Sequence, residues 1–173
     1  MSKESKFKSQ IFYRVVLPCL GLFFLSTAAF AQSFAYKALL DGIYDKKFPI
    51  VKPDQITCLS DYQILDTREK EEFEVSHLAG AKWVGYDSFN IKSTAELDKN
   101  KPVLVYCTVG ARSQDIGKQL VDAGFTQVYN LYGGIIHWAN ESKPLEAAGQ
   151  PSQKVHTYSR TWGIWLKKGE KVY

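Results

Sequence analysis

The chain has 173 residues, of which 45% are hydrophobic and 14% aromatic, enough apolar material for one folded core. Its formal net charge is +4, but the first 31 residues contain four basic residues and one acidic residue, so the remainder is almost neutral. A nearly neutral chain offers no broad cationic surface to nucleic acid or to an anionic membrane, and we expect neither as a partner.

The first 31 residues have the pattern of a secretory signal peptide. Basic side chains occur early, residues 15–30 are almost wholly apolar, and Ala29-Phe30-Ala31 has the small residues of a cleavage site. We expect cleavage after Ala31 and export to a bacterial periplasm, with no stable membrane insertion afterwards. Because the apolar run is about as long as the shortest membrane-spanning helices, an uncleaved membrane anchor is the alternative.

Segments typical of strands and helices alternate from residue 62 onwards. The expected strands are 62–65, 82–84, 103–106 and 127–131, and the expected helices are 69–73, 113–123 and 135–138, with a helical turn at 94–97. Asp66 and Thr67 are expected to cap the first helix. An apolar stripe of Ile116, Leu120 and Val121 is expected on the second. The alternation predicts an α/β fold, a small parallel sheet with helices on both faces.

Residues 145–173 contain fewer signals. An edge strand is expected at 155–158, and the apolar segment 161–166 is expected to pack against the preceding domain, with residues 34–44 as one candidate surface. A contact surface for another protein is the alternative for this segment.

Two cysteines, Cys58 and Cys107, lie beyond the expected cleavage site. Cys58 falls in residues 54–59, which are expected to form a short helix with the cysteine buried and inert. Cys107 directly follows the apolar strand 103–106 and precedes a short loop and a helix. Backbone N–H groups converge there and the helix presents its positive end, which favours a thiolate. A disulfide between the two cysteines is the competing interpretation in an exported chain, and it would block a nucleophilic role.

Three separated segments resemble the rhodanese-like family of sulfurtransferases. They are Asp66-Thr67-Arg68 with Glu72-Phe73 and residues 76–81, then residues 107–113 as C-x-x-G-x-R-S, and then residues 131–138 as L-x-G-G-I-x-x-W. Ser76 and Leu78 are mild departures from the family pattern. The resemblance implies a rhodanese-like fold for a domain at 48–144. Around this domain we expect the signal peptide at 1–31, an N-terminal extension at 32–47 and a C-terminal extension at 145–173 that packs on the domain.

The same resemblance implies a reaction and a set of site residues. Cys107 would be the catalytic nucleophile, taking a sulfane sulfur from a small sulfur-containing anion such as thiosulfate and passing it to cyanide or a thiol. The residues expected to bind the substrate are Thr108, Val109, Gly110, Ala111, Arg112 and Ser113. Their amides are expected to form an anion-binding cup, in which Gly110 adopts unusual backbone angles and Arg112 suits oxyanions.

Other interpretations remain beside this one. Phosphatases of the same fold place five residues between Cys and Arg, whereas four lie between Cys107 and Arg112, which favours sulfur over phosphate or arsenate. A non-catalytic module that binds a protein or senses oxidants through its thiol is the second alternative. No cofactor is expected, and no metal, because His137 and His156 lack ligand spacing.

Three further residues are expected to have structural roles. Asp66 and Arg68 are expected to bind each other or nearby backbone, and so to brace the neighbouring loop. His77 is expected to satisfy the backbone groups of a turn and not to act as a general base.

Overall fold

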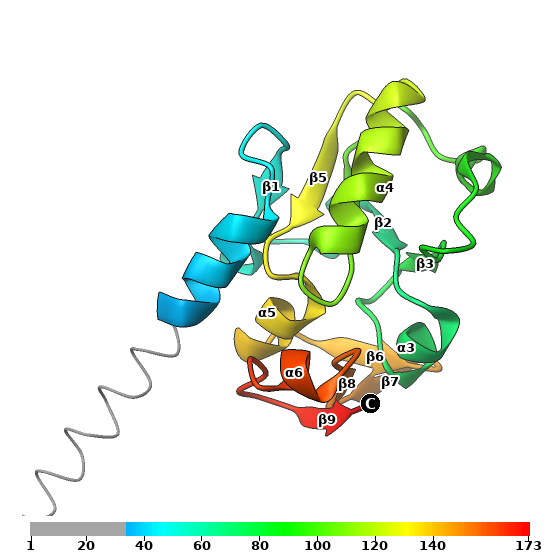
Figure 1. Ribbon diagram of the computed structural model, residues 1–173. Helices are drawn as coiled ribbons and strands as arrows, with labels where there is room; N and C mark the ends of the chain where they lie inside the picture. The colour runs from blue at the N-terminus through cyan, green and yellow to red at the C-terminus, as the bar shows by residue number, and fades with distance from the viewer. Residues whose placement is uncertain (1–33) are drawn as a thin grey trace, which may run out of the picture. The chain divides into compact units, whose positions relative to one another are not determined.

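The computed structural model describes residues 34–173 (Figure 1). The predicted signal peptide and its cleavage site lie outside the described residues. The chain divides into two compact units, and the fold below belongs to the second, Leu40–Tyr173. Residues 34–43 are helical, and within 34–173 no helix is long and apolar enough to cross a membrane.

A five-stranded parallel sheet forms the centre of this unit, with strand order β1-β5-β4-β2-β3. Its strands are β1 (Ile50–Val51), β2 (Gln63–Asp66), β3 (Lys82–Trp83), β4 (Val103–Tyr106) and β5 (Val128–Leu131). The central strand β4 pairs with β2 and β5, and all four of its residues are fully buried. The structure thus confirms the predicted central parallel strand.

Helices cover the sheet. They are α3 (Lys70–Val75), α4 (Ala111–Asp122) and α5 (Gly134–Asn140), with short 3-10 turns at η2 (Pro53–Gln55), η3 (Leu59–Asp61) and η4 (Ile91–Thr94). Val103 and Val105 of β4 join Ile116 of α4 in one apolar cluster. Because side chains alternate along a strand, Leu104 and Tyr106 face the opposite way, and both are also fully buried. The predicted α/β sheet with both faces covered is therefore confirmed.

Three local predictions are corrected. Asp66 and Thr67 do not cap α3, because Asp66 still belongs to β2, and Glu69 forms a capping box with Glu72 instead. Val121 is 48% exposed, because it lies one residue beyond the i, i+4 spacing that aligns the buried Ile116 and Leu120.

The third correction concerns Cys58. Residues 54–59 do not form one helix: Cys58 lies between the turns η2 and η3, with extended backbone. Its side chain is exposed and lies 3.0 Å from the Ser60 hydroxyl, so it is not the buried residue that we expected. Cys58 and Cys107 are both free.

The C-terminal residues form two small sheets and a short helix. β6 (Leu145–Ala147) pairs antiparallel with β7 (Gln150–Ser152), β8 (Lys154–His156) pairs parallel with β9 (Glu170–Val172), and α6 (Arg160–Gly163) lies between the last two. In Figure 1 these elements lie together beside α3 and α5, and β8 contacts both helices. Val155 of β8 is fully buried. The strand predicted at 155–158 ends at His156, two residues earlier than expected, because Tyr158 has a φ of +66°.

Candidate active site

The start of α5 holds the backbone of Cys107. The Cys107 carbonyl oxygen accepts a hydrogen bond from the Ile135 N–H at 2.9 Å. This approach depends on Gly134, whose φ is +55° and whose absent Cβ would lie 2.3 Å from the Cys107 oxygen. Cys107 is thereby fixed where β4 ends, at the carboxyl edge of the parallel sheet, which is where reactive groups gather in such folds.

The loop after Cys107 directs an amide at the sulfur. The Gly110 N–H donates to Cys107 Sγ at 3.1 Å. Gly110 has a φ of +107°, a conformation that residues with a side chain resist, which confirms the expectation for this glycine. A hydrogen bond of this kind stabilises an anionic sulfur more than a neutral thiol.

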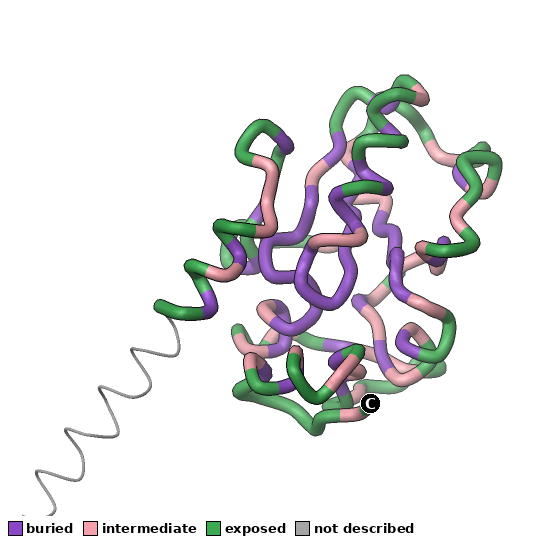
Figure 2. Tube along the Cα trace, in the orientation of Figure 1, coloured by how far each residue is buried: buried purple, intermediate pink, exposed green. Residues whose placement is uncertain are grey.

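The thiol is enclosed in this structure. Residues 107–110 are all buried, as Figure 2 shows for the loop that follows β4. Cys107 itself exposes only 1% of its surface. A donor molecule therefore reaches the sulfur only when neighbouring groups move.

The Arg112 guanidinium already has a carboxylate partner. Its Nη1 and Nη2 donate to the two oxygens of Glu72 at 2.8 and 3.0 Å. Burial favours the neutral form of each group, but the mutual hydrogen bonds dominate, so the pKa of Glu72 is lowered and that of Arg112 is raised. The predicted substrate-binding role of Arg112 stays a prediction, and it requires a donor to compete with Glu72.

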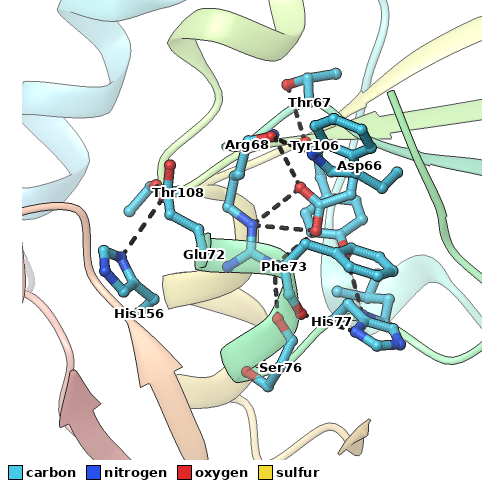
Figure 3. A network of polar contacts seen from close by, with 12 residues as sticks. Asp66, Thr67, Arg68, Glu72, Phe73, Ser76, His77, Tyr106, Thr108 and His156 are labelled. Carbon is cyan, nitrogen blue, oxygen red and sulfur yellow. Dashed lines mark hydrogen bonds and ion pairs between the residues drawn. The ribbon is translucent and has the colours of Figure 1, made fainter. Parts of the chain in front are cut away.

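Glu72 also joins groups from two further parts of the chain (Figure 3). Thr108 donates its hydroxyl hydrogen to Glu72 Oε1 at 3.0 Å, and His156 Nδ1 lies 3.9 Å from the same oxygen. Burial lowers the pKa of His156, although Glu72 opposes this effect. The imidazole nitrogen Nδ1 accepts the Tyr158 N–H at 3.2 Å, which fits a neutral ring.

Tyr158 from the C-terminal extension lies against Arg112. The Arg112 guanidinium carbon is 4.9 Å from the centre of the Tyr158 ring, within range of a cation–π contact. Tyr158 is 57% exposed and has left-handed backbone angles. The extension therefore contributes to the surroundings of the arginine.

The Ser113 side chain supports the backbone of the loop through Asn130. Its hydroxyl donates to Asn130 Oδ1 at 2.7 Å, and Asn130 Nδ2 donates to the Gly110 carbonyl at 2.8 Å. Ser113 and Asn130 are fully buried, so the Ser113 side chain supports the loop backbone. Of the other predicted loop residues, Val109 is buried and Ala111 is half-buried.

The ion pair expected between Asp66 and Arg68 is confirmed (Figure 3). Arg68 Nε and Nη2 donate to the two Asp66 oxygens at 2.9 and 2.6 Å, and Nη2 also donates to the Ser76 carbonyl. Both side chains are fully buried. His77 contacts backbone as expected, but its Nδ1 lies 3.0 Å from the Phe73 carbonyl oxygen of helix α3 and not of a turn, and its ring stacks on Phe73.

Several site residues were not singled out as site residues from the sequence. Glu72 belongs to the first family-like segment but no site role is predicted for it, and nothing in the spacing of the chain relates His156 or Tyr158 to the loop. Asn130 reads as an ordinary strand residue. Each acts through contacts between distant segments, which no local pattern contains. Among residues 34–173, no group of three or more His, Cys, Asp or Glu side chains is arranged to hold a metal.

Comparison with known proteins decides the family. Residues 55–141 match the family model described as Rhodanese-like domain, and this segment lies inside the expected domain. The chain belongs to the rhodanese-like domain family. The chain is 38% identical over 78 residues to the thiosulfate sulfurtransferase GlpE of Coxiella burnetii. The matched segment covers 45% of this chain and 72% of that protein. It is also 30% identical over 132 residues to a tRNA uridine(34) hydroxylase of Yersinia pestis, covering 66% of this chain and 37% of that one.

Solved structures show the same rhodanese fold. A thiosulfate sulfurtransferase from Pseudomonas aeruginosa matches with a TM-score of 0.55 and 22% identity, covering 66% of this chain and 23% of that chain. A rhodanese-like domain protein from Staphylococcus aureus matches with a TM-score of 0.51 and 23% identity, covering 59% of this chain and all of that one. At these identities the likeness concerns the fold alone.

Proposed function

We propose that this rhodanese-like protein is a sulfurtransferase that carries a sulfane sulfur on Cys107 as a persulfide. The observation that carries the proposal is the Gly110 N–H aimed at the Cys107 sulfur, at the carboxyl end of the central strand. Membership of the rhodanese-like family and the similarity to thiosulfate sulfurtransferases support the same chemistry.

The transfer takes two balanced steps. The Cys107 thiolate attacks the outer sulfur of thiosulfate, a new S–S bond forms, and the bond to the inner sulfur breaks, with sulfite leaving with the electron pair. Cyanide then attacks the terminal sulfur of the persulfide, thiocyanate leaves, and the Cys107 thiolate is regenerated. A protein or small-molecule thiolate is the alternative acceptor. This order predicts ping-pong kinetics.

The chain's own residues supply the electrostatic part of the reaction. The Gly110 amide stabilises negative charge on Cys107 in the thiolate and the persulfide. An anionic donor would meet the Arg112 guanidinium in competition with Glu72, and the neighbouring side chains would have to move to admit it. We expect the donor anion to displace part of this ion pair.

Mass spectrometry of the reduced protein after thiosulfate treatment tests the proposal. We expect one added sulfur atom on the peptide that contains Cys107, removed by cyanide and absent from Cys107→Ser. Cys58→Ser is the matched control, because Cys58 is the exposed cysteine of the described chain, and it should retain the added sulfur. An unmodified Cys107 in protein that is folded and reduced would overturn the proposal.

A thiol redox sensor without sulfurtransferase activity is the second candidate. The free Cys107 thiol beside the Gly110 N–H supports it, because a thiolate is also the form of cysteine that a peroxide oxidises. In the same experiment this candidate predicts a sulfenic acid after peroxide treatment and no added sulfur after thiosulfate treatment.

Export remains a proposal that rests on the sequence of residues 1–31. It predicts that protein recovered from the periplasm of an expressing bacterium begins at Gln32. Cytoplasmic protein with an intact N-terminus would contradict it, and membrane-bound protein with that N-terminus would favour the uncleaved anchor.

A further inference from the structure

Tyr44 places its hydroxyl group between two segments of the site. It lies just after the helix 34–43 and outside residues 55–141, the part of the chain that matches the family. The hydroxyl has one hydrogen, and the carbonyl oxygens of Val109 at 2.8 Å and Leu131 at 3.1 Å share it as acceptors, with Val109 at the shorter distance. It also accepts the Gly133 N–H at 2.8 Å. The hydroxyl thus ties the loop after β4 to the turn before α5.

The contact with Val109 bears on the sulfur through a single peptide group. The Val109 carbonyl and the Gly110 N–H belong to the same planar trans unit, in which C=O and N–H point in opposite directions. Tyr44 holds the oxygen on one side, and the N–H on the other side donates to Cys107 Sγ at 3.1 Å. Rotating this peptide would break both hydrogen bonds together.

The Tyr44 hydroxyl lies where a side chain on residue 110 would begin. A Cβ on Gly110 would lie 1.7 Å from the Tyr44 hydroxyl oxygen. The next carbonyl, that of Gly110, is held by Asn130 at 2.8 Å. Tyr44 and Asn130 therefore fix two successive peptide groups. Glycine at position 110 allows both the positive φ and the close approach of the Tyr44 hydroxyl.

Neighbouring residues anchor Tyr44 itself. Its N–H donates to the Leu40 carbonyl at 3.0 Å, which continues the preceding helical turn. The next residue, Asp45, donates its N–H to Gln114 Oε1 at 2.7 Å, and its carboxylate pairs with Lys118 at 2.9 Å. Because Gln114 and Lys118 belong to α4, the segment that carries Tyr44 is attached to the helix that follows the loop.

We propose that Tyr44 is a positioning residue that orients the 109–110 peptide, so that its N–H stabilises negative charge on the Cys107 sulfur. The proposal deepens the proposed function and rests on it for the persulfide. The effect of Tyr44 on the Cys107 thiolate does not depend on whether Cys107 transfers sulfur. Tyr44 acts on the Cys107 sulfur through the Gly110 amide.

Tyr44→Phe tests the proposal, because it removes the hydroxyl and keeps the ring. The measurement is the pH dependence of Cys107 alkylation by iodoacetamide in the full chain, resolved by mass spectrometry at the peptide that contains Cys107. We expect the midpoint to rise by about one pH unit, so that alkylation below the midpoint is about tenfold slower. A merely structural role would lower the melting temperature without moving this midpoint.

Tyr132→Phe is the matched control. The Tyr132 ring centre is 5.2 Å from that of Tyr44, but its hydroxyl donates to the Asp41 carboxylate at 3.4 Å. We expect its midpoint to equal that of the unaltered chain. An equal shift in both variants would overturn the proposal, because the effect would then follow from general packing around the two rings.

A second measurement keeps the proposal testable if Tyr44→Phe is partly unfolded. In the folded population, the amide proton resonance of Gly110 should titrate with Cys107 in the unaltered chain and lose this titration in Tyr44→Phe. A folded Tyr44→Phe with an unchanged midpoint and an unchanged Gly110 titration would overturn the proposal. If the unaltered chain never gains a sulfur from thiosulfate, the proposed function fails while the difference in midpoint still decides the role of Tyr44.

Discussion

Glu72 connects three parts of the chain through one carboxylate. It accepts hydrogen bonds from Arg112 and Thr108 and lies near His156, while its own backbone belongs to α3. It also accepts the Glu69 N–H in the capping box of that helix. A carboxylate with this many donors is stabilised in its charged form, although it is almost fully buried.

Acid should therefore weaken the fold through Glu72. Its pKa in the folded protein is below the ordinary value of 4.5, so the unfolded chain binds the proton more tightly. The resulting stabilisation is complete well above pH 4.5 and is lost as the pH falls through the folded pKa. Glu72→Gln should lower the free energy of unfolding at pH 7 by about 2 kcal/mol, because Arg112 loses its charged partner.

Urea unfolding between pH 7 and pH 3 checks this prediction. Stability should fall more steeply with acid in the unaltered chain than in Glu72→Gln, so that the two curves converge at low pH. Glu74→Gln is the control, because Glu74 is largely exposed and pairs only at 3.8 Å with Lys70 within the described chain. Parallel curves for Glu72→Gln and the unaltered chain would contradict the role given to this carboxylate.

At the scale of elements, the site depends on how β4 meets α5. The first N–H groups of α5 donate to the carbonyls of Cys107 and Thr108, so the helix begins against the backbone of the reactive loop. Two consecutive glycines, Gly133 and Gly134, have positive φ and allow this approach. A larger residue at the second position would meet backbone atoms, which cannot swing aside as a side chain can.

Gly134→Ala should separate this collision from ordinary backbone strain. Its Cβ would lie 2.3 Å from the Cys107 oxygen, whereas Gly80 has a comparable φ of +74° and nothing within 4 Å of its Cβ position. Both substitutions carry the cost of a positive φ, roughly 1 kcal/mol. Gly134→Ala should cost about 2 kcal/mol more than Gly80→Ala, because overpacking is added. Equal losses in urea unfolding would show that the junction absorbs the extra carbon.

Across residues 40–173, the C-terminal extension is part of the packed structure. β8 contacts α3 and α5, Val155 is fully buried, and Leu166 is 4% exposed. The Ser76 hydroxyl also donates to the Lys154 carbonyl, and Asn140 binds the Trp165 carbonyl. The extension thus covers one end of the domain. Within the extension, His156 lies near Glu72 and Tyr158 lies against Arg112.

Deleting residues 152–173 should lower the melting temperature by about 10 °C or more, because the burial of Val155 and Leu166 and the contacts of β8 with α3 and α5 are lost. A point substitution gives a milder test: Val155→Ala removes buried methyl groups, whereas Ile164→Ala alters a side chain that is 53% exposed. Val155→Ala should destabilise by about 1–2 kcal/mol and Ile164→Ala by much less. An unchanged melting curve for the deletion would contradict the packing.

Much of the fold follows from local patterns. The apolar run 103–106 and the stripe of Ile116 and Leu120 predicted β4 and α4, because burial on a strand or a helix imposes a period on the sequence. The errors occur where several local solutions compete. Asp66 has the side chain of a helix cap, but its backbone pairs with Trp83 of β3 and Tyr106 of β4, and its carboxylate binds Arg68. Cys58 has an apolar side chain, but the two turns around it leave it exposed.

The sequence by itself determined the α/β alternation, the position of Cys107 after the central strand and the need for glycine at 110, because each depends on a few neighbouring residues. Only the tertiary structure decided which groups surround that cysteine. Tyr44, Glu72 and Tyr158 are far apart along the chain, and the folded sheet and its extensions bring the first to the loop backbone and the other two to Arg112. Such contacts depend on long-range packing, which leaves no periodic trace in the sequence.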